Sequence, residues 1–181
     1  APDTDHPKLE LFSTSKNTVD TGSESRIVNI SMQVSDESSI SNARIMCLDK
    51  KTNQSMVDLT IRPEMGDTVR ARFKGVYETS NLTVAQFGQS VRWDIALKFP
   101  FNRPAGDCNW EWAATDSLGN RVSGMNDTGK TLKVLQADVA PDTDLYTLSP
   151  FTIASNGGAA TAFIDASISS AESLSQITVS A

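Results

Sequence analysis

Residues 90–99 read SVRWDIALKF, and the large apolar side chains of this stretch occupy every second position. One face of an extended chain would therefore carry Val91, Trp93, Ile95, Leu97 and Phe99. Alternation with a period of two is typical of a β-strand with one buried face, because successive side chains of a strand point to opposite sides of the sheet. The stretch predicts a strand of an antiparallel sheet, with Trp93 in the core.

The same alternation recurs along the first three quarters of the chain. It predicts further strands at residues 8–13, 26–35, 42–48, 56–62, 108–115 and 130–136. Clusters of Asp, Asn, Gly and Pro separate these segments and favour turns, and no segment has the apolar spacing of a convincing amphipathic helix. Many short strands joined by turns indicate a sandwich or a barrel, of which we take the sandwich. The predicted fold class is all-β.

Residues 68–87 are interpreted as a hairpin inserted into this sandwich. Its arms are residues 68–77 and 82–87, and its turn lies at residues 78–81. An insertion of two strands, rather than one, leaves residues 42–48 and 108–115 antiparallel, as an immunoglobulin-type sandwich requires. The hairpin is therefore compatible with that architecture.

Composition limits the classes of partner. The chain has 181 residues and a formal net charge of −6 at pH 7. Nucleic acids and anionic membranes bind cationic surfaces, so we expect neither partner. No apolar run approaches the roughly 20 residues of a membrane-spanning helix, so membrane insertion is not expected.

The opening sequence of the chain recurs near residue 140. Residues 1–5 (APDTD) recur as residues 140–144, and Leu9-x-x-Phe12-Ser13 is matched by Leu148-x-x-Phe151-Thr152. Further along, apolar positions continue to match after the offset shrinks from 139 to 134 residues, as if one loop were shorter by five. Repetition of this kind is typical of tandem modules. We interpret residues 1–136 as one module, 137–144 as a linker and 145–181 as the first strands of a second, similar module. We expect further chain, or a partner, to complete the second one.

Five short motifs resemble the immunoglobulin-like repeats of large bacterial secreted and cell-surface proteins. They are Asp3-x-x-x-Pro7-x-Leu9-x-x-Phe12-Ser13, Thr18-Val19-Asp20, Val34-Ser35-Asp36-x-Ser38-x-Ile40, Gly106-x-x-x-Trp110 and Thr115-Asp116-x-x-Gly119-Asn120. The resemblance implies an immunoglobulin-like antiparallel β-sandwich and an extracellular, tandem, non-catalytic module, found in adhesins or appended to secreted hydrolases. The chain departs from the pattern in the 68–87 hairpin and in Ser41, where such repeats commonly have Gly.

The two cysteines, Cys47 and Cys108, fall on the core side of residues 42–48 and 108–115 by the parity of the alternation. These two strands are neighbours in the immunoglobulin arrangement, and an even number of cysteines in an exported protein favours a disulfide. The alternative is a pair of buried thiols packed as small apolar groups. Two thiols and one histidine do not supply the four ligands of a structural zinc site.

Calcium is the one cofactor that the sequence suggests. The leading residues and two predicted loops share one end of the sandwich and gather the oxygen ligands Asp3, Asp5, Asp36, Glu37, Asp116 and Asn120. Calcium takes six to eight such ligands. The competing interpretation is that Asp and Asn occur in turns because their side chains bind the local backbone.

The aromatic residues are candidates for a contact surface. Trp93, Trp110 and Trp112 are in phase with core residues, whereas Tyr77, Phe87 and Phe101 lie near loops or on the hairpin and are candidates for a contact patch.

The single histidine, His6, lies in the leading segment beside Pro7, where no packed scaffold holds it, and no catalytic motif is present. We expect no enzyme activity.

These observations predict an extracellular or cell-surface module that spaces and presents its neighbours, with the adjoining repeats as partners and a surface glycan or protein as a candidate ligand. The alternative is a carbohydrate- or protein-binding accessory domain of a secreted hydrolase.

Overall fold

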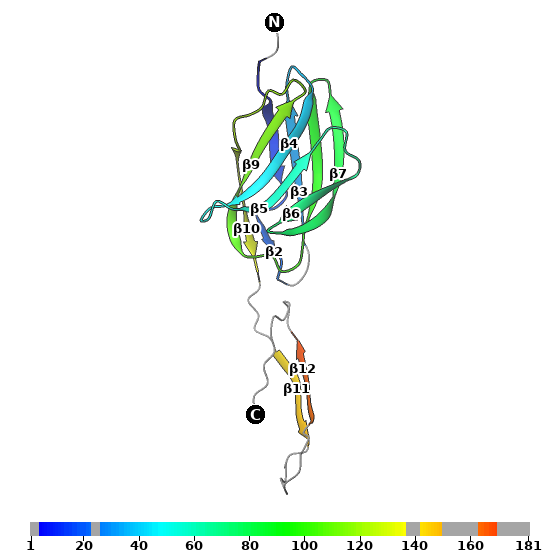
Figure 1. Cartoon of the computed structure of the whole chain (residues 1–181), viewed down its shortest axis with the longest axis vertical. Helices are drawn as coiled ribbons and strands as arrows, with labels where there is room; N and C mark the ends of the chain where they lie inside the picture. The colour runs from blue at the N-terminus through cyan, green and yellow to red at the C-terminus, as the bar shows by residue number, and fades with distance from the viewer. Residues whose placement is uncertain (1–3, 23–25, 137–141, 150–162, 170–181) are drawn as a thin grey trace. The chain divides into compact units, whose positions relative to one another are not determined.

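The computed structural model describes residues 4–22 and 26–136 in full, and residues 142–149 and 163–169 as backbone. Contacts divide the chain into two compact units, residues 1–136 and 137–181. All the regular secondary structure described is β, which confirms the predicted fold class (Figure 1). The described residues include no helix long and apolar enough to span a bilayer.

The first unit contains ten strands. They are β1 (Lys8–Thr14), β2 (Thr18–Asp20), β3 (Arg26–Ser35), β4 (Ile40–Asp49), β5 (Ser55–Ile61), β6 (Thr68–Phe73), β7 (Val76–Phe87), β8 (Ser90–Phe99), β9 (Gly106–Asp116) and β10 (Asn126–Leu135). Each segment that alternates in the sequence is one of these strands. The alternation holds because one face of each strand is buried, so that Val91, Trp93, Ile95, Leu97 and Phe99 of β8 are all buried.

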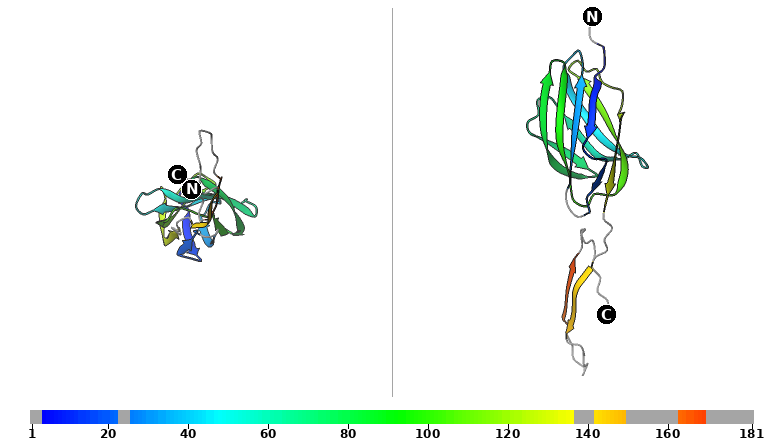
Figure 2. Two further views of the ribbon diagram at one scale, coloured as in Figure 1. Left: turned by 90° about the horizontal axis from the view of Figure 1, so that it is seen from below. Right: turned by 180° about the vertical axis from the view of Figure 1, so that it is seen from behind.

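The ten strands form one mixed sheet in the order β1-β3-β8-β7-β6-β5-β4-β9-β10-β2. Neighbours are antiparallel except β2 and β10, which run parallel. The sheet curls around a single core, and contacts between β1 and β10 and between β2 and β3 bring its two edges together (Figures 1 and 2). It is narrowest between β5 and β6, where Asp58 and Arg72 are the only paired residues.

The hairpin at residues 68–87 exists, but its turn differs from the prediction. β6 and β7 are joined at Lys74 and Gly75, not at residues 78–81, and both residues have positive φ, 42° and 89°. Such a two-residue turn matches the twist of the flanking strands. β7 also pairs with β8 from Asn81 to Phe87. The hairpin is therefore part of the sheet and not an appendage.

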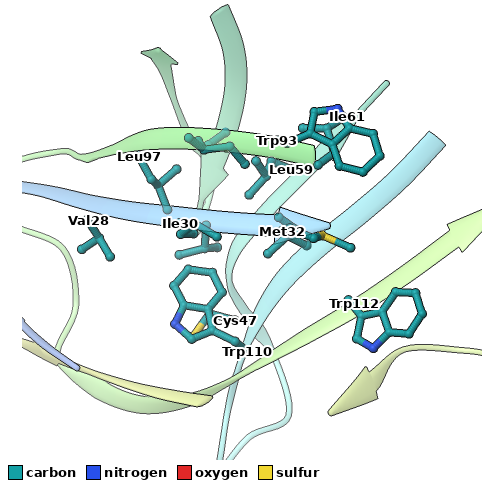
Figure 3. Packing of buried hydrophobic residues seen from close by; sticks show 14 of the residues in the cluster. Val28, Ile30, Met32, Cys47, Leu59, Ile61, Trp93, Leu97, Trp110 and Trp112 are labelled. Carbon is teal, nitrogen blue, oxygen red and sulfur yellow. The ribbon is translucent and has the colours of Figure 1, made fainter. Parts of the chain in front are cut away.

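The core lies inside the curled sheet. Its largest fully buried side chains are Trp93, Trp110, Phe73, Phe99, Ile30 and Met32. Trp112 is 7% exposed, so all three tryptophans pack inside as predicted. Phe12 lies against Trp110 with ring centroids 6.2 Å apart, which ties β1 to β9. Figure 3 shows Trp93 and Trp110 among the aliphatic side chains of β3, β5 and β8.

Cys47 of β4 and Cys108 of β9 form the disulfide that the sequence favours. The two cysteines are fully buried, their Cα atoms are 5.4 Å apart, and Cys47 is the register partner of Trp110. Figure 3 shows the sulfur of Cys47 beside the Trp110 ring. The bond joins neighbouring strands of the sheet across a sequence separation of 61 residues.

Asp49 holds the turn between β4 and β5. Its Oδ1 atom accepts hydrogen bonds from the backbone N–H groups of Lys51 and Thr52, at 2.8 and 2.9 Å. The Thr52 and Lys51 N–H groups lower the pKa of the Asp49 carboxyl, because they stabilise the charged form. Because folding lowers this pKa, the charged carboxyl stabilises the fold at pH values above the usual aspartate pKa. The contribution is lost as the pH falls through the lowered pKa of the folded state.

We expect the Asp49→Asn variant to lose less stability on acidification than the wild type. Asn keeps the Oδ1 acceptor of the turn and removes the titrating carboxyl. Denaturant unfolding at pH 6 and pH 2.5 measures the effect, and the free-energy gap between the two proteins should narrow at the lower pH. Equal loss in both proteins would show that Asp49 does not contribute to the acid dependence.

The start of β9 passes close to the same turn. A Cβ atom at Gly106 would lie 2.8 Å from Asp49 Oδ2 and 3.2 Å from the Met56 side chain. Since Oδ1 of the same carboxylate holds the turn, the group cannot rotate away freely. Gly106→Ala should lower the free energy of unfolding by about 1–3 kcal/mol, as overpacking does. Gly66→Ala is the control, because nothing lies within 4 Å of its Cβ position; equal melting temperatures of the two variants would contradict the steric argument.

The second unit contains two described strands, β11 (Asp142–Ser149) and β12 (Phe163–Ser169), paired antiparallel. β11 begins at Asp142, inside the segment interpreted as a linker.

Candidate functional site

Four connections between strands gather at one end of the first unit. β3, β5, β7 and β9 run toward this end, and β4, β6, β8 and β10 start from it (Figure 1). Residues 36–39, 62–67, 88–89 and 117–125 therefore lie together, with residues 4–7 beside them. We call this part of the molecule the loop end.

A groove with a volume of about 430 Å³ opens at the loop end. We call it the loop-end groove, and its lining residues are Ser39, Ile40, Ser41, Pro63, Glu64, Gln86, Gly88, Gln89, Val91 and Ser117. Hydroxyl and amide side chains predominate, and Glu64 is the one charged group in the lining. Such a lining offers hydrogen-bond donors and acceptors to a neutral polar ligand.

The turn between β7 and β8 sets one wall of the groove. Phe87 pairs with Ser90, so Gly88 and Gln89 form a two-residue turn, and Gly88 has a φ of 59°. A positive φ at the first turn position suits glycine. The Phe87 side chain is 60% exposed, and its chain neighbours Gln86 and Gly88 line the groove.

The turn after β9 borders the opposite side. Asp116 is 2% exposed, and its Oδ1 atom accepts hydrogen bonds from the backbone N–H groups of Leu118 and Asn120 at 2.9 and 2.7 Å. The Asn120 side-chain amide donates to Asp116 Oδ2 at 2.7 Å. This anchored turn presents Leu118, which is 63% exposed.

A second, acidic hollow of about 220 Å³ adjoins the groove, and Gln89 lines both. Its lining residues are Asp5, His6, Lys8, Glu10, Ser35, Asp36, Glu37, Gln89 and Ser90. A hydrogen bond from Ser35 lowers the pKa of Glu10, with smaller contributions from Gln33 and Ser90. Glu10 therefore carries its negative charge under mildly acidic conditions.

The predicted calcium ligands fall into three groups. Asp5, Asp36 and Glu37 line the acidic hollow. Asp116 and Asn120 lie at the same end but are engaged with each other, as the turn interpretation requires. Asp3 lies outside the described residues. Within the part of the chain that the structure describes, no group of three or more His, Cys, Asp or Glu side chains is arranged to hold a metal ion. The calcium site stays a prediction.

The three aromatic residues predicted as a contact patch are not brought together. Tyr77 and Phe87 lie at opposite ends of β7, roughly 30 Å apart at the rise of an extended strand. Tyr77 is 52% exposed and lies under the Arg70 guanidinium, 4.5 Å from the ring centroid. Phe101 is half-buried beyond the end of β8. Of the three, only Phe87 has chain neighbours, Gln86 and Gly88, that line the loop-end groove.

Sequence reasoning missed most of the groove. The serines and glutamines of its lining come from three separate segments of the chain, and no local motif marks such residues. Two signals did point to this end. They are the Phe87-Gly88 step, where a glycine follows an exposed aromatic, and the Asp116-x-x-Gly119-Asn120 turn.

The hydroxyl, amide and carboxylate groups of the lining can hold a ligand by hydrogen bonds. Comparison with models of protein families, with curated proteins and with solved structures finds no match for this chain.

Proposed function

We propose that residues 1–136 are an extracellular, immunoglobulin-like, non-catalytic module that spaces and presents neighbouring modules. The observation that carries the proposal is the path of the chain. β1 starts at the loop end, and β10 leaves at the opposite end (Figure 1). A module of this kind can be joined to neighbours at both ends and transmit tension along its strands.

Sheet topology supports the immunoglobulin-like interpretation. The narrow β5–β6 junction separates one layer, β1-β3-β8-β7-β6, from another, β5-β4-β9-β10-β2. The first segment of the chain contributes to both, because β1 pairs with β3 and β2 pairs with β10. Greek-key sandwiches of two facing layers have this general organisation.

The parallel pairing of β2 with β10 supports a role under tension. Lys133 N donates to Asn17 O at 2.8 Å, and Thr21 N donates to Leu135 O at 2.9 Å. β2 follows the entry of the chain and β10 precedes its exit, so a pull on the two ends loads these bonds together, along the strands. Breaking several bonds at once needs more force than breaking them singly.

The disulfide supports an extracellular location. Structural disulfides persist in oxidising compartments and are rare in the cytosol. The Cys47–Cys108 bond is fully buried and holds residues 47–108 in a closed loop. A module that stays partly closed when pulled suits a spacer at a cell surface.

Pulling the full chain at its two ends tests the spacer function. The oxidised protein should unfold in a step shorter by about 220 Å than the reduced protein, since 61 residues stay locked. Lys133→Pro, which removes the donor to Asn17, should lower the unfolding force, and Lys133→Ala, which keeps it, should not. Unfolding at negligible force in the oxidised wild type would rule out the proposal.

The loop-end groove favours a second candidate function, a glycan- or protein-binding accessory domain. Sugars are bound by hydroxyl, amide and carboxylate groups beside an exposed ring. Ser39, Gln86 and Glu64 of the lining supply the polar groups, and Phe87, the chain neighbour of Gln86, is the exposed ring. A glycan array probed with the full chain tests it. Phe87→Ala should abolish binding, whereas Tyr77→Ala, a similarly exposed ring at the other end of β7, should not. Equal effects of both variants would exclude the groove.

A further inference from the structure

The β11–β12 pair repeats the β1–β3 pair residue for residue. Lys8 pairs with Ser35 and Thr14 with Ile30; at a constant offset of 134, Asp142 pairs with Ser169 and Leu148 with Ile164. Both pairs also shift register at the same place, between Leu9 and Leu11 in the first and between Thr143 and Leu145 in the second. An irregularity repeated at one offset is a feature of internal duplication rather than of two unrelated hairpins.

The amino acids at equivalent positions of the two strand pairs are also similar in type. Glu10-Leu11-Phe12-Ser13 corresponds to Asp144-Leu145-Tyr146-Thr147, which keeps acid, leucine, aromatic and hydroxyl in order. The repeat of residues 1–5 at 140–144 implies a different offset, 139, and a loop shortened by five residues. The strand register needs no such shortening. The duplication therefore follows the offset of 134 through both strands.

The first unit shows what covers the other edge of β3. β8 pairs with β3 over ten residues, from Arg26 with Phe99 to Ser35 with Ser90. Ser15 N donates to Asn29 O on the β1 side, and Asp36 N donates to Gln89 O on the β8 side. Because backbone groups alternate along a strand, the even-numbered residues of β3 face β8.

The same parity applies to β12 through the offset of 134. Ile164, Ala166 and Ile168 correspond to Ile30, Met32 and Val34, so their N–H and C=O groups face the edge opposite β11. Among the residues that the structure describes, β12 pairs with β11 and with no other strand. A strand edge without a pairing partner is a template for pairing with another strand.

We propose that this edge of β12 is a docking edge for an antiparallel strand with the alternation of β8. The inference rests on the proposed function, in which modules are joined in series, and it takes β11 and β12 as the first strands of a second module of the same kind. The occupant is an extended segment with an apolar residue at every second position, because β8 meets β3 in that form. The main-chain bonds supply affinity, and the alternating side chains supply specificity.

A synthetic peptide of residues 90–99 (SVRWDIALKF) added to the full chain tests the proposal. Hydrogen exchange at the amides of Ile164, Ala166 and Ile168 should slow at least tenfold, whereas the amides of Asp165 and Ser167, which face β11, should change little. A peptide of the same composition in blocks (SRDAKVWILF) lacks the alternation and should give no protection.

Two variants separate edge docking from loss of structure. Ala166→Pro removes one N–H from the docking edge and none from the β11 ladder, so it should abolish protection by the peptide. Ala166→Ser keeps that N–H and should preserve protection.

Three results would overturn the docking edge. They are equal protection by the block peptide, no protection by either peptide, and protection of β12 without peptide in a dimer, which would make a second copy the occupant. The force-unfolding experiment tests the spacer function of the first unit independently of peptide binding to β12. A normal unfolding force without peptide binding overturns the docking edge alone, and binding without a force peak overturns the spacer function alone.

Discussion

Removal of the Cys47–Cys108 disulfide is expected to lower the free energy of unfolding by about 4 kcal/mol. The bond closes a loop with a sequence separation of 61 residues, and the chain-entropy model gives that figure for such a loop. For a unit of this size the melting temperature should fall by roughly 10–15 °C. Thermal and denaturant unfolding of the Cys47→Ala/Cys108→Ala variant, beside the oxidised wild type, measures the loss.

Reduction of the wild type is the matched control, because it opens the loop without removing side chains. Both cysteines are fully buried, so the double variant also leaves small cavities and should be slightly less stable than the reduced wild type. A melting temperature unchanged by either treatment would mean that the ladder between β4 and β9 holds these strands without the covalent bond.

Truncation of Trp93 to alanine is expected to cost about 3–5 kcal/mol, the range for fully buried aromatic residues. Trp93 also donates from Nε1 to the carbonyl oxygen of Arg62 at 3.1 Å, which links β8 to the end of β5 across the core. Trp93→Phe removes this hydrogen bond as well as part of the ring. The Arg62 oxygen then keeps a longer bond, 3.4 Å, from Met65 N.

Trp110 is the matched control for Trp93. It is equally buried, but its Nε1 atom has no hydrogen-bond partner in the described part of the chain. Trp110→Phe loses ring volume and at the same time removes a buried unpaired donor, so we expect it to be less destabilising than Trp93→Phe by about 1 kcal/mol or more. Denaturant unfolding of both variants measures the difference, and the reverse order would contradict the hydrogen-bond argument.

The strands and the core could be predicted from the sequence, because the alternation of apolar and polar residues within a strand shows which face is buried. Residues 90–99 alternate, and the structure buries every large apolar side chain of that stretch. The same parity assigned Cys47 and Cys108 to the core side of their strands, and the immunoglobulin-like resemblance favoured those strands as neighbours; the structure joins the two cysteines. The turn of the 68–87 hairpin did not follow, because Lys74 and Gly75 adopt positive φ without an Asn-Gly or Asp-Gly signal.

The candidate site was less predictable than the fold. Asp36 and Asp116 were noticed as oxygen ligands, but their Oδ1 atoms accept hydrogen bonds from the backbone N–H groups of their own loops. Gln86 and Ser117 were not predicted as site residues, because an isolated amide or hydroxyl forms no sequence motif. Only the fold brings them beside other polar side chains. Tyr77 and Phe87 looked equivalent in the sequence, and only the length of β7 separates them.

The sequence by itself determined the all-β class and the buried face of each strand, including the core-facing side of both cysteines, because these depend on side-chain period over a few residues. The tertiary structure alone decided the order of the ten strands, the parallel pairing of β2 with β10 and the grouping of loops into a groove. These features depend on contacts between residues far apart in the chain. Local periodicity records which side of a strand is buried, and it carries no information about which strand lies next to it.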